Sequence, residues 1–371
     1  MRIAVLWKRR YMGHDVITDR YARLYELPRG LADAGDDVLG LCLSYRPAVV
    51  SREAHALVGS GSLAWRGFTA GPAVIGGLPG YHRAVLQELR AFQPDVLLGG
   101  SDAVHAVLTR YFSVRIGVPY VLDLYDNFES FGLTRIPGLL SMYRRALRGA
   151  AGITTVSDLL SEYVRSVAIG VPVKALESTI DPALFSPRDR AAARERLGLP
   201  TAERLVGVSG SLGRNRGIEV VYSAFERILS DDPSLHLVLA GDVDRRALPP
   251  THARVRFLGR IAHTEMANFF SAMDLALVPM IDTDFGRYAF PQKAYEILAC
   301  RTPILTADIG ALARTLAAYP RCLYRAGDAA DLVRAVREQL AAPQRPELPI
   351  PTWSDQALRL DAFIREVVGG V

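Results

Sequence analysis

Short apolar runs alternate with amphipathic segments along most of the chain. The runs are almost continuously apolar, which is typical of strands buried on both faces of a parallel sheet. Helical spacing follows them, most clearly after Gly217, where apolar residues recur every three or four positions. We expect strands at 3–7, 37–43, 96–100, 120–125, 152–157 and 173–177, and in the second half at 205–210, 236–241, 255–259, 275–279, 303–307 and 322–325.

Two such series predict an α/β protein with two doubly wound, Rossmann-like domains. The polar, proline-containing stretch 181–189 is the best candidate for a linker. We therefore expect one domain over residues 1–180 and a second over 190–350, with a last helix at 353–369. Ligands of doubly wound folds bind outside the carboxyl ends of the strands, so a cleft between the two domains is the expected site.

Length and charge agree with this picture. The 371 residues exceed the roughly 250–300 that a single core usually serves, and an apolar content of 50% excludes a disordered chain. The net charge of +5 comes from scattered residues without a basic reading surface, so we expect no nucleic-acid partner. Only three of the 44 Lys and Arg residues are lysines. Lys8, Lys174 and Lys293 are thus candidates for roles that arginine cannot fill.

The sequence shows no signal-like or membrane-spanning apolar run. Its three cysteines are widely spaced and lack a metal-ligand pattern, so we expect free thiols in a cytoplasmic protein. The helical segment 139–148 combines an apolar side with three arginines. An ordinary solvated helix face is one interpretation. Peripheral contact with anionic lipid at the inner face of the cytoplasmic membrane is the other.

A glycine-rich segment at 210–217 follows a predicted strand and leads into a predicted helix. Glycines allow a ligand to approach closely, and the first N–H groups of a helix carry partial positive charge. Arginine adds forked donors that suit phosphate groups. We expect phosphate or diphosphate contacts from Gly210, Ser211, Gly213, Arg214 and Arg216, the alternative being a turn with solvated arginines.

A second candidate segment begins at Pro291, a residue type that suits the first turn of a helix. Lys293 and Glu296 are three positions apart and share a helix face. A cation at a helix start needs an anionic partner. This position, together with the rarity of lysine, favours a phosphate- or sugar-facing role for Lys293 over a surface ion pair.

Carboxylates give weaker signals. The D-x-D patterns at 242–244 and 282–284 are typical of metal–nucleotide sites, but aspartate is equally common in turns, so we expect no metal site. Asp126 follows the strand 120–125 and could orient an acceptor hydroxyl, N-capping being the alternative. Among the histidines, only His14 lies in a loop placed for function.

These motifs resemble those of the retaining glycosyltransferases of GT-B fold, specifically family 4. Gly210-Ser211-Leu212 with Arg216-Gly217-Ile218-Glu219 resembles the donor-diphosphate segment of the family. Pro291-x-Lys293-x-x-Glu296 resembles its donor motif, whose glutamate contacts the ribose. The resemblance extends to the strand end at Gly241, to the segment 255–260 near the nucleotide base with Gly259 and Arg260, and to Trp353 before a terminal helix that crosses back onto the first domain.

The resemblance implies transfer of a sugar from a UDP- or GDP-sugar to a hydroxyl acceptor with retention of configuration, in cell-envelope glycan, glycolipid or other glycoconjugate biosynthesis. It implies catalytic roles for Arg216, Lys293 and Asp126, and acceptor contacts from Gly13, His14 and Asp126. The acceptor would be a glycan, a lipid-linked molecule or a small molecule, and no metal or other cofactor is expected. Two alternatives stay open: a non-catalytic nucleotide-sugar-binding subunit and a sugar-nucleotide 2-epimerase.

The sequence departs from the family pattern at four places, one of which is Arg301, where the family has a glycine. Tyr288 stands where the first glutamate of the E-x7-E pair is expected, so that residue is not assigned a catalytic role. The glycine pair after the first strand is replaced by the sequence at 11–15, and the usual N-G-V-D before the linker is replaced by the sequence at 178–181.

Overall fold

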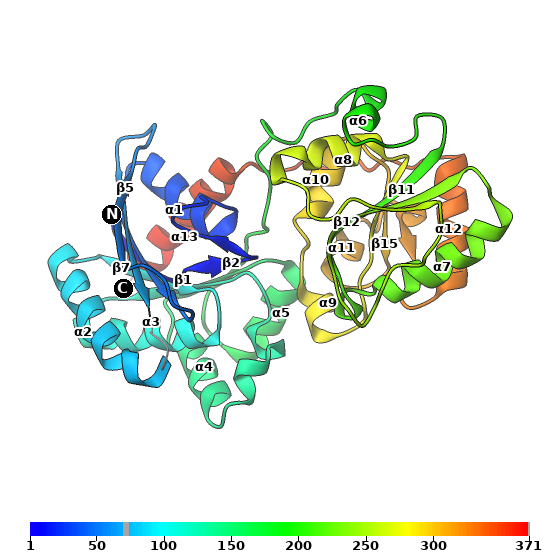
Figure 1. Ribbon diagram of the computed structural model, residues 1–371. Coiled ribbons are helices and arrows are strands. Elements are labelled where there is room, and N and C mark those ends of the chain that lie inside the picture. The colour runs from blue at the N-terminus through cyan, green and yellow to red at the C-terminus, as the bar shows by residue number, and fades with distance from the viewer. Residues whose placement is uncertain (70–73, 370–371) are drawn as a thin grey trace. The chain divides into compact units, whose positions relative to one another are not determined.

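The computed structural model describes residues 1–69 and 74–369, without the side chains of 74–79. The chain divides into two compact units (Figure 1). Unit 1 comprises Met1–Ser178 and the C-terminal segment Pro351–Val371, and unit 2 comprises Thr179–Ile350. The chain therefore passes from unit 1 to unit 2 shortly before the stretch 181–189 that the sequence suggests as a linker.

The core of unit 1 is an eight-stranded sheet with the order β10-β9-β8-β7-β1-β4-β6-β5. All neighbouring strands are parallel except β5 and β6, which are antiparallel. Without β5 the order is doubly wound, and it reverses between β1 and β7. The bounds are β1 (Arg2–Lys8), β4 (Asp37–Ser44), β5 (Ser51–His55), β6 (Ser62–Thr69), β7 (Val96–Gly100), β8 (Tyr120–Leu124), β9 (Gly152–Thr155) and β10 (Val173–Ala175).

Helices cover this sheet. Figure 1 shows α1 (blue) and α13 (red) side by side, although they come from opposite ends of the chain. Their approach is close, because a Cβ atom on Gly30 would lie 2.4 Å from the Cβ of Ala357. The helices of unit 1 are α1 (Arg23–Asp33), α2 (Val74–Phe92), α3 (Ala103–Ile116), α4 (Leu139–Arg148), α5 (Asp158–Val167) and α13 (Trp353–Gly369), with 3-10 turns η1 (Phe128–Ser130) and η2 (Gly132–Arg135).

Unit 2 is built on six parallel strands in the order β13-β12-β11-β14-β15-β16. Numbered along the chain, this is the 3-2-1-4-5-6 order of the Rossmann fold, and it reverses between β11 and β14. The strands are β11 (Arg204–Leu212), β12 (Leu235–Val243), β13 (Val255–Phe257), β14 (Leu275–Val278), β15 (Ile304–Ala307) and β16 (Leu323–Tyr324).

The helices of unit 2 include α7 (Ile218–Asp231), whose apolar stripe is buried as its spacing predicts. No helix within the described residues is both long enough and apolar enough to cross a membrane. The others are α6 (Arg190–Arg196), α8 (Met266–Ala272), α9 (Asp284–Tyr288), α10 (Lys293–Ala299), α11 (Gly310–Thr315) and α12 (Ala329–Ala341), with 3-10 turns η3 (Arg214–Arg216), η4 (His263–Glu265) and η5 (Pro320–Cys322).

The predicted α/β class with two doubly wound sheets is confirmed, and each of the twelve predicted strands is present. Two strands at the edge of unit 1, β5 and β6, were not predicted. In β6 buried and less buried residues alternate, and Leu63 and Trp65 point into the core. Such a period-two pattern contains no continuous apolar run, which is the signal that predicted the other strands. The short hairpin β2 (Arg10–Tyr11) and β3 (His14–Asp15) was also not predicted.

Candidate functional site

Each unit has one place where its strand order reverses, and doubly wound folds bind ligands outside the carboxyl ends of the strands at such a place. In unit 1 these ends belong to β1 and β7, and in unit 2 to β11 and β14. We call the two places the switch points of unit 1 and unit 2. Most of the residues that the sequence singles out lie near one of them.

Lys293 brings its ammonium group to the end of β11 at the switch point of unit 2. The side chain starts at the first residue of α10, and its Nζ donates a hydrogen bond to the carbonyl of Ser209. A Cβ atom on Gly210 would lie 2.8 Å from this Nζ, and Gly210 has a φ of +98°. Both the backbone conformation and the space for the ammonium therefore require glycine at position 210.

The charge of Lys293 is only partly compensated. Burial and the nearby positive charge of Arg216 lower the pKa of Lys293 to about 8, against the opposing effect of Glu296. Arg216 lies in η3, with its guanidinium 4.1 Å from the centroid of the Phe285 ring. Lys293 and Arg216 thus bring two positive charges that repel one another to one strand end, and an anionic ligand would be favoured there.

Glu296 lies one turn beyond Lys293 on α10 and is only 6% exposed. Its Oε1 accepts a hydrogen bond of 3.2 Å from the amide of Gln292 and lies 3.6 Å from Nε2 of His263. A carboxylate held in this way can accept further hydrogen bonds from hydroxyl groups with its other lone pairs.

The two other arginines predicted to bind the donor have acidic partners at the surface. Arg214 Nε lies 3.0 Å from Glu219 Oε1. Arg260 makes two contacts with Asp242, of 2.5 and 2.6 Å. Exposed ion pairs of this kind contribute little free energy, so a phosphate group could compete for either guanidinium.

The glycines of this region shape the strand ends. A Cβ atom on Gly241 would lie 1.9 Å from the carbonyl oxygen of Gly210, and Gly241 has a φ of +133°. This close approach lets β11 and β12 stay paired as far as Leu212, so the glycine-rich loop is shorter than the sequence suggests. Gly213 follows β11, Gly259 accepts a 2.8 Å hydrogen bond from the N–H of Gly241, and Pro291 lies two residues before α10.

Aspartates of the D-x-D patterns pair with arginines. Asp242 binds Arg260, and Asp282 lies 2.6 Å from Arg287. Within residues 1–69 and 74–369, no group of three or more His, Cys, Asp or Glu side chains is arranged to hold a metal ion. Tyr288, which occupies the position of the first glutamate of the E-x7-E pair, is the last residue of α9.

In unit 1 the predicted acceptor residues belong to two neighbouring segments. Gly13 lies in the turn of the β2–β3 hairpin with a φ of +88°, so this hairpin replaces a glycine loop. His14 stacks on Tyr21 with ring centroids 4.3 Å apart, and its Nδ1 lies 3.5 Å from Asp19. Asp126 follows the end of β8 and is partly buried.

A further polar cluster at the switch point of unit 1 was missed at the sequence level. Asp102 follows β7 and caps α3 by accepting a hydrogen bond from the N–H of His105. The Asp102 carboxylate also accepts a 3.0 Å hydrogen bond from the hydroxyl of Tyr45 and lies 2.9 Å from His105 Nδ1. The last residue of β1, Lys8, lies nearby. We call Lys8, Tyr45, Asp102 and His105 the Asp102 cluster.

The ammonium of Lys8 lies 5.4 Å from the centroid of the Tyr125 ring and 6.0 Å from that of Tyr11. Burial lowers the pKa of Lys8, while the negative charges of Asp102 and Asp126 oppose this effect. A donor and two acceptors at one strand end can bind hydroxyl groups. The sequence held a signal for Lys8, because it is one of only three lysines and directly follows the first predicted strand.

Two Rossmann-like units, one with cations at its switch point, are typical of nucleotide-binding proteins of the two-domain α/β class. The family model "Glycosyl transferases group 1" matches residues 203–342, and the "Glycosyl transferase 4-like domain" model matches residues 22–177. Together the two models cover most of both units. The chain belongs to this family of glycosyltransferases, which have the GT-B fold.

Individual relatives agree with this family. The D-inositol 3-phosphate glycosyltransferases of Mycobacterium tuberculosis and Mycobacterium bovis are 32% identical to the chain over 145 residues, which cover 36% of this chain and 28% of the relative. Sucrose-phosphate synthase from Thermosynechococcus elongatus superposes with a TM-score of 0.77 at 20% identity, and Anabaena HepE in complex with UDP with a TM-score of 0.70 at 16% identity. Both comparisons cover 100% of each chain, and at these identities they show a common fold.

Proposed function

We propose that the protein transfers a hexosyl group from a UDP- or GDP-sugar to a hydroxyl group of an acceptor, with retention of anomeric configuration. The observation that carries this proposal is the convergence of Lys293 and Arg216 at the end of β11. Two cations at one strand end suit a nucleoside diphosphate as leaving group. Anabaena HepE, which has the same fold, is described in complexes with UDP and with UDP-glucose, which supports this class of donor.

In this proposal unit 2 binds the donor. Lys293 and Arg216 neutralise the negative charge that grows on the leaving diphosphate as the bond to the sugar breaks. Arg214 and Arg260 exchange their exposed acidic partners for phosphate or nucleotide groups. Glu296 accepts hydrogen bonds from the ribose hydroxyls. Backbone around Gly210, Ser211, Gly213, Gly241, Gly259 and Pro291 shapes the nucleotide site.

Unit 1 then binds the acceptor, which belongs to a cell-envelope glycan, a glycolipid or another glycoconjugate. Asp126 orients the attacking hydroxyl, while Gly13 and His14 border it. Lys8 adds a hydrogen-bond donor for the acceptor, a role that no sequence motif indicates. Retention follows when the hydroxyl attacks from the face that the diphosphate leaves and a phosphate oxygen takes its proton. Neither a protein nucleophile nor a metal ion has a necessary role in this scheme.

Donor binding can be tested by titration calorimetry with UDP and GDP in the presence of EDTA. We expect one of the two to bind, and Lys293→Ala and Arg216→Ala to lose turnover by about 10²–10³-fold while keeping the wild-type melting temperature. Arg227→Ala is a matched control, because Arg227 is an exposed arginine on α7 in the same unit. Wild-type binding and turnover in both site variants would show that the donor site is wrongly assigned.

Retention can be tested independently of the site. Early in the reaction, the anomeric configuration of the new glycosidic bond is measured by NMR with an α-linked nucleotide sugar as donor. We expect an α-linked product. A β-linked product would overturn the proposed stereochemistry without affecting the assignment of the donor site.

We also propose that the protein acts in the cytoplasm at the inner face of the cytoplasmic membrane, through the surface segment 131–148 of unit 1. Phe131, Leu133, Ile136 and Met142 are 41–54% exposed in this segment. Three exposed arginines accompany them, and the segment contains no acidic residue. Its fourth arginine, Arg144, pairs with Glu129 just outside the segment. Apolar side chains beside cations suit an anionic lipid surface.

Vesicle sedimentation tests this surface. We expect the protein to bind vesicles of phosphatidylcholine with phosphatidylglycerol, more weakly at high salt, and not vesicles of phosphatidylcholine alone. The double variant Met142→Ser/Arg145→Glu should reduce binding by about tenfold. The control Leu358→Ser/Arg227→Glu also replaces one exposed apolar residue by serine and one exposed arginine by glutamate, but outside this segment. Equal loss in both double variants would argue against a specific lipid surface.

A further inference from the structure

An aromatic ring lies against one of the two cations at the switch point of unit 2. The guanidinium of Arg216 lies over the ring of Phe285, 4.1 Å from its centroid. A cation and an aromatic ring attract one another within about 6 Å, so this contact is well inside that range. Arg216 ends η3, which follows β11, and Phe285 lies in α9, which follows β14. The contact therefore joins the loops of the two strands between which the strand order reverses.

The helix that carries the Phe285 ring is closely packed against neighbouring backbone. A Cβ atom on Gly286 would lie 2.1 Å from the carbonyl oxygen of Ile281. A Cβ atom on Gly310, the first residue of α11, would lie 2.5 Å from the carbonyl oxygen of Arg287. These close approaches leave α9 little room to shift, so its backbone holds the ring at a fixed place.

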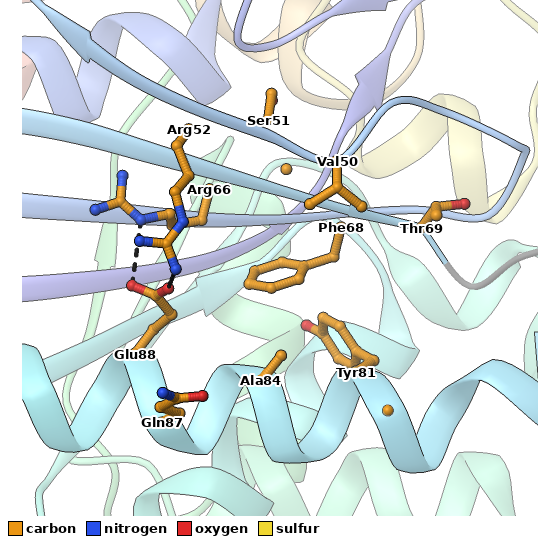
Figure 2. A pocket seen from close by; sticks show the side chains of 12 residues that line it. Val50, Ser51, Arg52, Arg66, Phe68, Thr69, Tyr81, Ala84, Gln87 and Glu88 are labelled. Carbon is orange, nitrogen blue, oxygen red and sulfur yellow. Dashed lines mark hydrogen bonds and ion pairs between the residues drawn. The ribbon is translucent and has the colours of Figure 1, made fainter.

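A ring holds an arginine in a different way from a carboxylate. Figure 2 shows the usual way, around a pocket of unit 1, where Arg52 and Arg66 both donate hydrogen bonds to Glu88. In such a pair, the carboxylate occupies N–H groups and its negative charge opposes an anionic ligand. An aromatic ring attracts the guanidinium through its face and has no net charge. An arginine over a ring thus keeps its full charge for a phosphate group.

The ring also opposes the repulsion between the two cations of the site. The positive charge of Arg216 lowers the pKa of Lys293, which shows that the two side chains disfavour one another. This repulsion favours positions of the Arg216 side chain that are farther from Lys293. The contact with Phe285 counteracts it, and a side chain that is already in place loses less conformational entropy when a ligand binds.

We propose that Phe285 is a positioning residue for Arg216, whose guanidinium it holds at the end of β11 before the diphosphate of the donor binds. The identity of the diphosphate rests on the proposed function, whereas the hold on Arg216 does not. The same short helix carries Tyr288 in place of the first glutamate of the E-x7-E pair. In this chain, α9 thus serves the anionic part of the ligand through an aromatic side chain.

A double-mutant cycle tests this role. Pyrophosphate, UDP and GDP are titrated by calorimetry, in the presence of EDTA, into the wild type, Phe285→Leu, Arg216→Ala and the double variant. We expect Phe285→Leu to weaken binding by about threefold to tenfold, because leucine keeps an apolar side chain but lacks the face of a ring. In the Arg216→Ala background, the same change should alter the affinity by less than about twofold.

Two further variants separate positioning from a general effect on the fold. Phe285→Tyr keeps the face of the ring, and we expect it to bind the ligands as the wild type does. Tyr111→Leu is the matched control, since it removes a ring whose centroid is 4.9 Å from the Arg115 guanidinium in unit 1. It should leave the affinities unchanged. The proposal is overturned if Phe285→Leu binds like the wild type, if it loses affinity equally in both backgrounds, or if Phe285→Tyr binds as weakly as Phe285→Leu.

Pyrophosphate separates this proposal from the proposed function, because it has phosphate groups but neither a base nor a ribose. If the cycle shows coupling with pyrophosphate while neither nucleotide binds, the donor assignment fails and the role of Phe285 stands. If a nucleotide binds but the two substitutions act independently, the donor site stands and the role of Phe285 is wrong. If the wild type binds neither pyrophosphate nor a nucleotide, both proposals are wrong.

Discussion

Apart from the edge strands β5 and β10 of unit 1, the two units share a strand order, but they differ in the charges at their switch points. In unit 2, Lys293 lies near another cation, Arg216, and one buried carboxylate, Glu296. In unit 1, Lys8 lies near two carboxylates, Asp102 and Asp126. Unit 2 therefore favours an anionic ligand, and unit 1 a ligand with hydroxyl groups and little charge. We therefore propose that one fold serves two kinds of binding, with the side chains at the strand ends deciding between them.

Each unit also contains a buried arginine that pairs with an aspartate, but the two pairs lie at different places in their sheets. In unit 1, Arg23 is fully buried and binds Asp123 in β8 with hydrogen bonds of 2.6 and 2.8 Å. In unit 2, the buried Arg194 binds Asp274, just before the amino end of β14. The ion pair of unit 2 therefore lies at the edge of the sheet opposite its switch point. The Asp274 carboxylate therefore lies at the other end of the strands from Lys293.

The largest effect is expected for Arg23→Met, which leaves Asp123 buried without its guanidinium. We expect the free energy of unfolding to fall by about 3–5 kcal/mol, measured by urea denaturation. The double variant Arg23→Met/Asp123→Leu should recover much of this loss, because it removes both charges. An unchanged denaturation midpoint in the single variant would contradict the role of this pair.

The second prediction concerns the two lysines at the switch points. Lys293→Met should lower turnover by about 10²–10³-fold and weaken UDP or GDP binding. Lys8→Met should raise the acceptor KM by about tenfold and leave nucleotide affinity unchanged.

Lys174→Met controls for the loss of a lysine, since Lys174 lies in β10 near the Phe363 ring. If Lys8→Met reduced nucleotide binding as strongly as Lys293→Met, the contrast between the two units would be wrong.

A smaller effect is expected from pH. Lys293 has a pKa of about 8, and a bound diphosphate favours its charged form. Nucleotide affinity should therefore fall as the pH rises through about 8 and the ammonium of the free protein loses its proton. Each unit by which the ligand raises this pKa corresponds to a tenfold change in affinity. Calorimetry between pH 7 and 9.5 measures the change.

Lys293→Arg is the informative comparison for this titration, because a guanidinium keeps its charge throughout the range. We expect its nucleotide affinity to change little with pH. A parallel decline in the wild type and in Lys293→Arg would assign the pH dependence to another group.

The smallest effect is expected for Glu219→Gln, which removes the exposed acidic partner of Arg214. Nucleotide affinity should rise by about twofold to fourfold, because the arginine no longer leaves an ion pair to bind phosphate. Glu226→Gln, at an exposed position of the same helix, should leave affinity unchanged. A loss of affinity in Glu219→Gln would mean that Glu219 itself contacts the ligand.

Most of the fold could be predicted because its strands are continuous apolar runs, each with its own local signal. The edge strand β5 and its neighbour β6 could not, since each has one less buried face and therefore alternating residues. Lys293 and Arg216 were found because each stands in a local motif. The Asp102 cluster was missed because its members follow different strands and meet only when β1 and β7 pair in the sheet.

Two of the three lysines lie at the switch points, which makes these places accessible to amine-directed chemistry. Amines with a lowered pKa are unprotonated in larger part near neutral pH and react faster with acylating reagents. Lys8 and Lys293 both have a lowered pKa, and the N-terminal amine is held by Asp36 at 2.6 Å. Amine-reactive labelling followed by mass spectrometry should therefore mark both switch points at once. Protection by a nucleotide at Lys293, and by an acceptor at Lys8, would report the occupancy of each unit separately.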